Sequence, residues 1–270
     1  MLAPDRLSEF DAFLLELNRA SAAVILPLFR GDHGIENKHA PGRDYDPVTL
    51  ADKGAEAEIR RLIAARYPEH GVIGEEMGED RPDAEFVWVL DPVDGTRAFV
   101  AGLPVWTTLI ALRFEGRPVL GSIGQPFIGE VFAGHAGGSR LLTAAGERPL
   151  KVRTGQPLSD AIIATTDPEA CFHRDEMAAW RALRAASRLA RLGCDAYAYA
   201  MVAAGTLDLV VESGLKSWDV EAAVPVIEGA GGLVTDWLGA PIGRHGGQMA
   251  IAGDRALLDE ALVWLTPAAK

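Results

Sequence analysis

Residues 86–99 read Phe-Val-Trp-Val-Leu-Asp-Pro-Val-Asp-Gly-Thr-Arg-Ala-Phe, and the rest of the chain is organised around this stretch. Its first five residues are apolar, β-branched or aromatic, which predicts a strand buried on both faces. The run stops at Asp91, and Pro92 turns the chain because it has no N–H to donate. Residues 96–100 could begin a helix. Asp91 and Asp94 therefore fall at the carboxyl end of a buried strand, where open α/β sheets bind ligands.

Two carboxylates as close as Asp91 and Asp94 repel each other, so a positive charge is expected between them. A hard divalent cation with oxygen ligands fits best, and Mg²⁺ is the usual choice when a phosphate is the other ligand. The alternative is an acidic turn in which an aspartate caps a helix. This stretch alone leaves both interpretations open.

Length and charge limit the classes of protein. A chain of 270 residues can bury a large core in one domain or two sub-domains. Its net charge of −12 argues against nucleic acid as a partner, because binders of nucleic acid usually carry a basic face. A small phosphate held by metals remains compatible with this charge, since the metals supply the positive charge.

Cysteine spacing and hydropathy predict a cytoplasmic protein without a membrane segment. Cys171 and Cys194 have neither metal-type nor redox-type spacing, and we expect reduced thiols. Residues 22–29 are apolar but too short to span a bilayer, and no basic segment precedes them.

Periodicity and turn residues predict the order of elements. The first half should contain a helix over 5–30 with a kink or break at Pro27, a mobile surface loop over 31–47, a helix from about Asp52 to Tyr67, and strands at 72–76, 86–90, 107–114, 119–124 and 130–133. A composition change near residues 145–158 predicts two parts, 1–150 and 151–270. The second half should alternate strands at 161–165, 188–192, 207–212, 233–235 and 249–252 with helices at 174–186, 195–204, 220–229 and 256–265, which is typical of an α/β layer.

Other acidic residues occur at the predicted ends of elements. Asp52 falls at a helix start, where the helix dipole favours a carboxylate. One of Glu75 and Glu76 could face an interior site, because successive side chains of a strand alternate. Glu212 ends a strand and Asp219 starts a helix, where it could cap the helix or hold a cation. Spacing does not decide between the two roles.

Three segments together match a known family. Gly74-Glu75-Glu76, the run from Asp91 to Thr96, and Trp218-Asp219 followed by Gly231-Gly232 resemble the inositol monophosphatase family in order and spacing. The resemblance extends from the first helix to Asp254. It implies a layered αβαβα fold of the inositol monophosphatase and fructose bisphosphatase type, Mg²⁺-dependent hydrolysis of a small phosphate monoester, and a homodimer.

The resemblance also implies a role for each matching residue. The first metal would be held by Glu75, Asp91 and the Val93 carbonyl, the second by Asp91, Asp94 and Asp219, and a third, weaker metal by Glu75, which therefore counts among the catalytic residues. Asp52 and Thr96 would orient and deprotonate the attacking water, and Asp94 with the N–H groups of Gly95 and Thr96 would surround the phosphate. These roles suit phosphoryl transfer, which needs charge neutralised on the phosphate and an aligned nucleophile.

Within the family, residues 94–99, 102–106, 193–199 and 214–216 look like the histidinol-phosphate phosphatase branch. Asp195 stands where inositol phosphatases usually carry a small residue. With Glu212 and Asp219 it would face a substrate that carries an ammonium and an imidazole. Alternatively, Asp195 caps the helix 195–204. Arg97 either steers the anionic ester or lies on the surface.

Two positions depart from the family pattern: Ala101 replaces a usual polar residue, and Glu221 replaces a usual small one. Glu221 could perturb the site if it turns towards Asp219.

We therefore hypothesise hydrolysis of L-histidinol phosphate, with an inositol-1-monophosphatase or a broad-specificity sugar-alcohol phosphatase as the alternative. A 3′-phosphoadenosine nucleotidase is disfavoured because no adenine pocket is obvious. A metal-binding scaffold protein without catalysis is disfavoured because Asp52, Glu75, Asp91, Asp94, Thr96 and Asp219 are all present.

Overall fold

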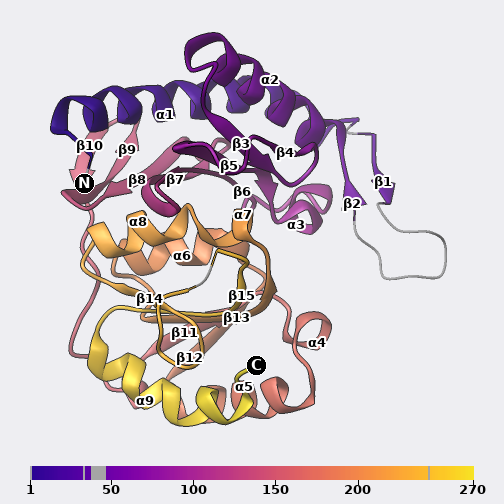
Figure 1. The fold of residues 1–270 in the computed structure, drawn as a ribbon. Helices are drawn as coiled ribbons and strands as arrows, with labels where there is room; N and C mark the ends of the chain where they lie inside the picture. Colours follow the sequence, from indigo (N-terminus) through magenta and orange to yellow (C-terminus); the bar gives the residue numbers. More distant parts are fainter. Residues whose placement is uncertain (1, 33, 38–46, 243) are drawn as a thin grey trace.

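The larger of two main sheets contains the strand that carries Asp91 and Asp94 (Figure 1). The structure is a computed structural model that describes residues 2–32, 34–37, 47–242 and 244–270. Strands of this sheet pair in the order β10-β9-β8-β7-β6-β5-β3-β4, with β3 parallel to β5 and the other neighbours antiparallel. Their bounds are Gly71–Gly74 (β3), Gly78–Asp80 (β4), Phe86–Asp94 (β5), Thr107–Phe114 (β6), Arg117–Gln125 (β7), Glu130–His135 (β8), Gly138–Thr143 (β9) and Gly146–Pro149 (β10).

The smaller sheet is formed by the second half of the chain. Its strands pair in the order β12-β11-β13-β15-β14, with β11 parallel to both β12 and β13 and the remaining pairs antiparallel. Their bounds are Ile162–Thr165 (β11), Leu189–Leu192 (β12), Leu209–Leu215 (β13), Leu233–Thr235 (β14) and Gly247–Ala252 (β15). A separate two-stranded ribbon pairs Glu36–Asn37 (β1) with Pro47–Val48 (β2).

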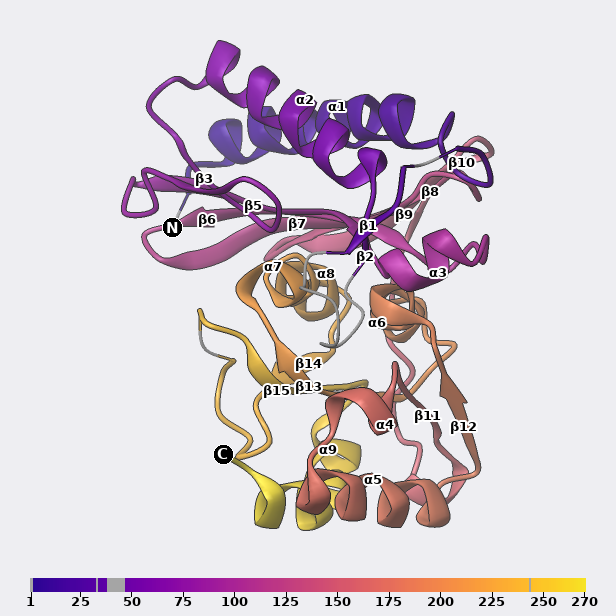
Figure 2. The same cartoon turned by 90° about the vertical axis from the view of Figure 1, so that its right-hand side faces the viewer.

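Helices cover both faces of each main sheet (Figure 2). From one side to the other, the layers are α1 with α2, the larger sheet, α6 with α8, the smaller sheet, and α5 with α9. This αβαβα arrangement confirms the predicted fold class. The helical bounds are Pro4–Ile25 (α1), Leu50–Arg66 (α2), Thr96–Val100 (α3), Pro168–Cys171 (α4), Arg174–Ala186 (α5), Asp195–Ala203 (α6), Ser217–Val220 (α7), Ala223–Gly229 (α8) and Arg255–Leu265 (α9), with short 3₁₀ turns at Leu158–Asp160 and Thr266–Ala268.

Each boundary between layers is an apolar core. Phe13 and Trp88 pack where α1 and α2 cover the larger sheet. Val89 and Val210, from the two sheets, belong to the core around α6 and α8. Trp237 belongs to the core under α5 and α9. Burial of large apolar side chains at these boundaries stabilises the layered order.

Several predicted boundaries need correction. The first helix ends at Ile25, which confirms the predicted break at Pro27 but not the continuation to residue 30, because Pro27 cannot donate a helical hydrogen bond. The predicted helix 220–229 is two helices, α7 and α8, since Pro225 has no N–H for the carbonyl of Glu221. Strands β9 and β10 were not predicted. Part of the predicted loop 31–47 forms the β1–β2 ribbon, and residues 33 and 38–46 lie outside the described residues.

The sheets change between Pro149 and Ile162, near the predicted division at residue 150. Helices α6 and α8, from the second half, lie against strands of both sheets. The division into 1–150 and 151–270 therefore stays a prediction. Over the described ranges, no helix has both the length and the apolar composition needed to cross a bilayer.

Candidate active site

A cleft of about 290 Å³ opens at the carboxyl ends of β3, β5 and β13, between the two halves of the chain. It brings together residues that are far apart in sequence. The predicted site residues that line it are Glu75, Asp91, Val93, Asp94, Gly95, Thr96, Arg97, Asp195, Glu212 and Asp219. Asp52 lies behind this wall and contacts Thr96.

The turn after the central strand is folded tightly. β5 runs on to Asp94 with an irregularity in its pairing with β6 between Asp91 and Asp94, so the predicted strand end at Asp91 is instead a bulge. The Val93 N–H donates to Asp91 Oδ1 at 3.1 Å. Asp94 Oδ2 accepts the Ala196 N–H at 2.7 Å and lies 3.2 Å from the Thr107 hydroxyl. The bulge leaves both aspartates facing the cleft.

Gly95 is required at its position for two reasons. Its φ of 81° lies in the left-handed region, which favours glycine. A Cβ there would also lie 2.8 Å from the Asp195 carboxyl carbon. The glycine thus allows α3 to start beside α6, and the first N–H groups of α3 have no intrahelical partner.

Asp91, Asp94 and Asp219 form the centre of the site. Each offers an oxygen that lies within 4.8 Å of the oxygens of the other two. Burial, followed by the charges of Glu75, Asp94 and Asp219, raises the pKa of Asp91 well above its usual value. Burial and the Asp195 charge raise the pKa of Asp94 in the same direction. The described cluster therefore lacks the positive charge that would favour its ionised form.

This donor set suits a hard divalent cation. All three groups offer carboxylate oxygens, and neither His nor Cys belongs to the cluster found among the described residues. Oxygen ligands alone are typical of Mg²⁺ and Ca²⁺, whereas zinc and copper sites usually include nitrogen or sulfur. The repulsion within the cluster is the feature that a bound cation would relieve.

Glu75 lines the same cleft from the turn after β3, and its charge acts on Asp91. β3 ends at Gly74, so Glu75 and Glu76 lie in a turn rather than in the predicted strand. The Glu75 N–H donates to the Leu90 carbonyl at 3.2 Å, which places this turn beside the end of β5. Glu56 holds the turn by accepting the N–H of Glu76 at 2.8 Å. A Cβ on Gly74 would collide with the Glu56 carboxylate.

Asp52 and Thr96 meet across two elements. Asp52 is the third residue of α2, and its Oδ2 accepts the N–H of the capping residue Thr49 at 2.9 Å. Its Oδ1 lies 3.2 Å from the Thr96 hydroxyl, which is also 3.1 Å from the Val93 carbonyl. Burial raises the pKa of Asp52, although the bonds from Thr49 lower it in part. One carboxylate thus serves both the helix cap and the contact with Thr96.

Asp219 is the third residue of α7 rather than its N-cap. Its Oδ2 accepts the Lys216 N–H at 2.7 Å. Glu221 turns away from Asp219 and pairs with Arg113, so the departure from the family pattern does not place an extra carboxylate in the cleft. Ala101 ends α3 and is exposed.

Two further carboxylates, Glu212 and Asp195, line the same cleft. Glu212 is buried and accepts the Thr166 N–H at 2.8 Å and the hydroxyls of Thr165 and Thr166 at 3.1 and 2.9 Å. Burial raises its pKa to about 8, against the lowering effect of these bonds. Asp195 is partly buried and makes no capping bond in α6, whose N-cap is Cys194, so the capping alternative is wrong. Burial raises its pKa to about 6.

Arg97 lies at the mouth of the cleft. It is exposed, and its guanidinium pairs with Asp167 at 3.4 Å. Among the described residues that line the cleft, it is the only cationic side chain. Arg97 therefore lies on the surface at the border of the cleft, and its steering of an anionic ester stays a prediction.

Some residues that support the site were not among those predicted from the sequence. Thr49 had a detectable signal, because a threonine three residues before an acidic residue is a capping pattern. Glu56, Thr107 and Thr166 had none, since each supports a residue from a different element.

Comparisons with known proteins find matches over most of the chain. The model of the inositol monophosphatase family matches residues 6–264. The chain is 42% identical to the bifunctional phosphatase IMPL2, described as chloroplastic, of Arabidopsis thaliana, over 88% of this chain and 67% of that protein. It is 34% identical to a histidinol-phosphatase of Streptomyces coelicolor, over 97% and 98% of the two chains. An inositol monophosphatase structure from Zymomonas mobilis superposes with a TM-score of 0.84 and 37% identity, over 96% and 98%.

Proposed function

The chain belongs to the inositol monophosphatase family, and from this premise we propose that it is a Mg²⁺-dependent phosphatase that hydrolyses L-histidinol phosphate to L-histidinol and phosphate. The observation that carries the choice of substrate is the pair of carboxylates, Glu212 and Asp195, that line the same cleft as the Asp91, Asp94 and Asp219 cluster. A dianionic phosphate alone needs no acidic wall around its leaving group.

In this proposal two or three Mg²⁺ ions occupy the acidic side of the cleft. One is held by Glu75, Asp91 and the Val93 carbonyl, a second by Asp91, Asp94 and Asp219, and a third, weaker one by Glu75. The support is the short spacing of the three aspartates and the repulsion that raises the pKa of Asp91 and Asp94. Bound Mg²⁺ would neutralise the phosphate oxygens and lower the pKa of a water molecule.

Asp52 and Thr96 are proposed to handle the attacking water. The Thr96 hydroxyl has one proton and two oxygen neighbours, the Asp52 carboxylate and the Val93 carbonyl. Donation to Asp52 leaves the hydroxyl oxygen free to accept a hydrogen bond from water, which orients the water. As the water gives its proton to this oxygen, the hydroxyl's own proton would pass to Asp52. The N–H groups of Gly95 and Thr96, together with Asp94, are proposed to border the phosphate.

The leaving group is proposed to lie against Asp195 and Glu212, with Asp219 and Arg97 at its borders. Histidinol carries an ammonium and an imidazole, and both can donate charge-assisted hydrogen bonds to carboxylates. Because burial raises the pKa of Asp195 and Glu212, a cationic group next to them would restore their ionised form. An uncharged polyol gains much less from such a wall.

An inositol-1-monophosphatase or a broad-specificity sugar-alcohol phosphatase is the second candidate. It is favoured by the likeness to the Zymomonas mobilis inositol monophosphatase structure. Carboxylates can also accept hydrogen bonds from sugar hydroxyls, so the metal side of the cleft would be the same for both candidates.

The deciding experiment measures phosphate release with Mg²⁺ from histidinol phosphate and from inositol 1-phosphate. We expect kcat/KM for histidinol phosphate to be higher by about 100-fold, or roughly 2.7 kcal/mol in transition-state binding. Asp195→Asn should reduce this preference by about tenfold, since a hydrogen bond to a charged group contributes roughly 1.5–3 kcal/mol. Asparagine tolerates the positive φ of 45° at this position, so the variant isolates the charge.

Equal kcat/KM values, or a preference for inositol 1-phosphate, would contradict the choice of substrate and leave the metal assignment standing. The proposal also includes a cytoplasmic location, as the cysteine spacing predicts, and a homodimer, as the family resemblance predicts. Light scattering on the purified protein measures the oligomeric state.

A further inference from the structure

A buried ion pair joins the two halves of the chain. Arg113 Nε donates to Glu221 Oε2 at 3.0 Å, and Arg113 Nη2 donates to Glu221 Oε1. The two side chains are 6% and 4% exposed. Two parallel bonds between a guanidinium and a carboxylate fix orientation as well as distance.

Each partner belongs to, or directly follows, an element that carries part of the cluster or pairs with the strand that carries it. Arg113 lies on β6, where it is opposite Val87 of β5, and the same ladder places Leu109 opposite Asp91. Glu221 follows α7 directly and is two residues from Asp219. The ion pair therefore connects the short helix that carries Asp219 to the sheet that carries Asp91 and Asp94.

Helix α7 needs outside contacts to hold its position. It has only four residues, and a helix of this length has little stability of its own. It packs on β5 and β6 through Val220, and the adjoining Ala222 is buried in the same core. Such apolar contacts are non-directional, so they hold the helix to the sheet without setting its rotation. The bidentate pair adds a directional contact between the residue after α7 and the larger sheet.

Stability alone does not explain the pair. Removing two charges from water costs several kcal/mol per ion, and apolar replacements of similar volume are often neutral or stabilising. A buried pair that costs so much is explained if it keeps an orientation that the site requires. At this position the orientation in question is that of Asp219 against Asp91 and Asp94.

We propose that Arg113 and Glu221 are positioning residues that set the affinity for a divalent metal by holding Asp219 against Asp91 and Asp94. This inference rests on the proposed metal role of Asp219. Neither residue lines the cleft, so their effect on the metal is exerted through α7.

The test measures Mn²⁺ binding to the metal-free protein from the spin-resonance signal of free Mn²⁺. Glu221→Gln and Arg113→Lys should each weaken Mn²⁺ binding by roughly tenfold, the usual effect of losing a residue that orients a metal ligand. The matched control is Asp208→Asn, which breaks the ion pair of Arg153 and Asp208 at the far end of β13, with bonds of 2.7 and 2.5 Å. The control should lower the unfolding temperature and leave Mn²⁺ affinity unchanged.

A double variant, Arg113→Met with Glu221→Leu, separates orientation from stability. We expect it to unfold at or above the wild-type temperature and still to bind Mn²⁺ weakly. Wild-type affinity in this variant, or in both single variants, would overturn the inference. The inference would also be overturned if Asp208→Asn weakened Mn²⁺ binding as much as the other variants do for the same loss of stability. Asp219→Asn identifies the cause: if it binds Mn²⁺ like the wild type, the proposed metal role itself fails.

Discussion

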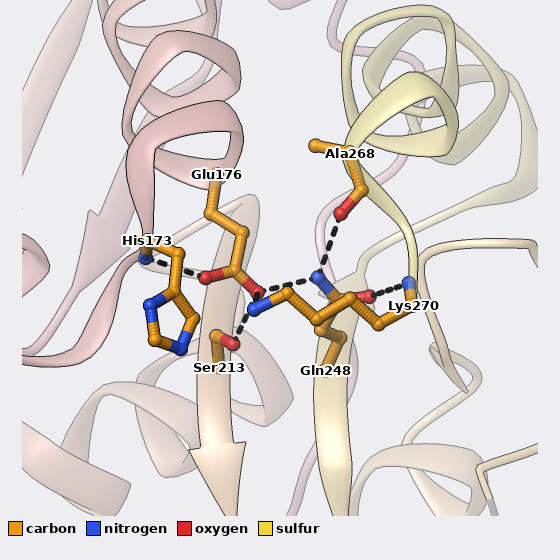
Figure 3. A network of polar contacts seen from close by, with 6 residues as sticks. All are labelled: His173, Glu176, Ser213, Gln248, Ala268 and Lys270. Atoms are coloured by element: carbon orange, nitrogen blue, oxygen red, sulfur yellow. Dashed lines mark hydrogen bonds and ion pairs between the residues drawn. The ribbon is translucent and has the colours of Figure 1, made fainter.

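Two carboxylate sites in this protein differ in the number of hydrogen-bond donors and positive charges around them. Glu176, on α5, is fully buried and is surrounded by donors (Figure 3). Its oxygens accept the His173 N–H at 2.7 Å, the Ser213 hydroxyl at 2.7 Å and the Gln248 amide at 2.6 Å, and the Lys270 ammonium lies at 3.1 Å. Asp94 in the cleft has the Ala196 N–H and the Thr107 hydroxyl, together with other carboxylates.

The pKa values move in opposite directions as a result. Burial alone would raise the pKa of Glu176, but the bonds from His173, Ser213, Lys270 and Gln248 lower it to about 2. Burial and the neighbouring carboxylates raise the pKa of Asp94. Donors from several elements surround Glu176, which joins those elements together. The cleft around Asp94 is short of positive charge. That shortage is what a metal would correct.

The largest expected effect comes from removing one charge from the cleft. Asp94→Asn should lower kcat/KM by about a thousandfold or more, because the metal's stabilisation of the transition state amounts to several kcal/mol. The same variant, freed of metal, should unfold at a higher temperature than the metal-free wild type, since one repulsive charge is gone. Activity within about tenfold of wild type would contradict the metal assignment.

Metal removal should reveal the next largest difference. Mg²⁺ at about 100 times its dissociation constant should stabilise the wild type by roughly 2.7 kcal/mol over the protein in EDTA. Glu176→Gln should gain the same increment, and Asp94→Asn much less. Urea unfolding with and without Mg²⁺ measures both. Equal increments in all three proteins would show that the metal binds elsewhere.

The matching substitution in the donor-rich site should affect stability alone. Glu176→Gln places an amide against the His173 N–H and removes the charge opposite Lys270. We expect a loss of about 2 kcal/mol, reduced from the full pKa shift because Lys270 is half exposed. That loss lowers the unfolding temperature by roughly 5 °C. A change in kcat/KM beyond about threefold would contradict the separation of the two sites.

The smallest effect is a pH dependence with a defined sign. Because the pKa of Glu176 falls from 4.5 to about 2 on folding, its contribution is present above pH 4.5 and is lost as the pH falls towards 2. The gap in unfolding free energy between wild type and Glu176→Gln should therefore shrink to about half near pH 3. Urea titrations of the metal-free proteins measure the gap, and a constant gap would exclude the lowered pKa.

Local patterns were sufficient for much of the metal side of the site. The apolar run before Asp91 specifies a buried strand, and Pro92 with Gly95 specifies the turn that follows. The position of Asp52 at a helix start follows from periodicity and capping. These features could be predicted because each depends on neighbours within a few residues.

Other features depend on partners far apart in the chain. Glu212 is held by Thr165 and Thr166, 47 and 46 residues away, and Arg113 finds Glu221 at a separation of 108. The sequence placed Asp219 at the start of a helix 220–229, whereas Asp219 belongs to a separate short helix, α7. Hydrophobic periodicity cannot predict contacts between residues so far apart in the chain.

The sequence by itself determined most of the elements and the acidic motifs, because hydrophobic period, proline, glycine and capping residues act over one or two turns. The layered class followed from the resemblance of those motifs to a known family. Only the tertiary structure decided which buried carboxylates receive donors and which do not. The physical reason is that a carboxylate's pKa depends on every charge and donor within a few ångströms, and packing brings those groups together from distant segments. Glu176 and Asp94 are both acidic residues in the sequence, and their surroundings alone make one an anchor and the other a candidate ligand.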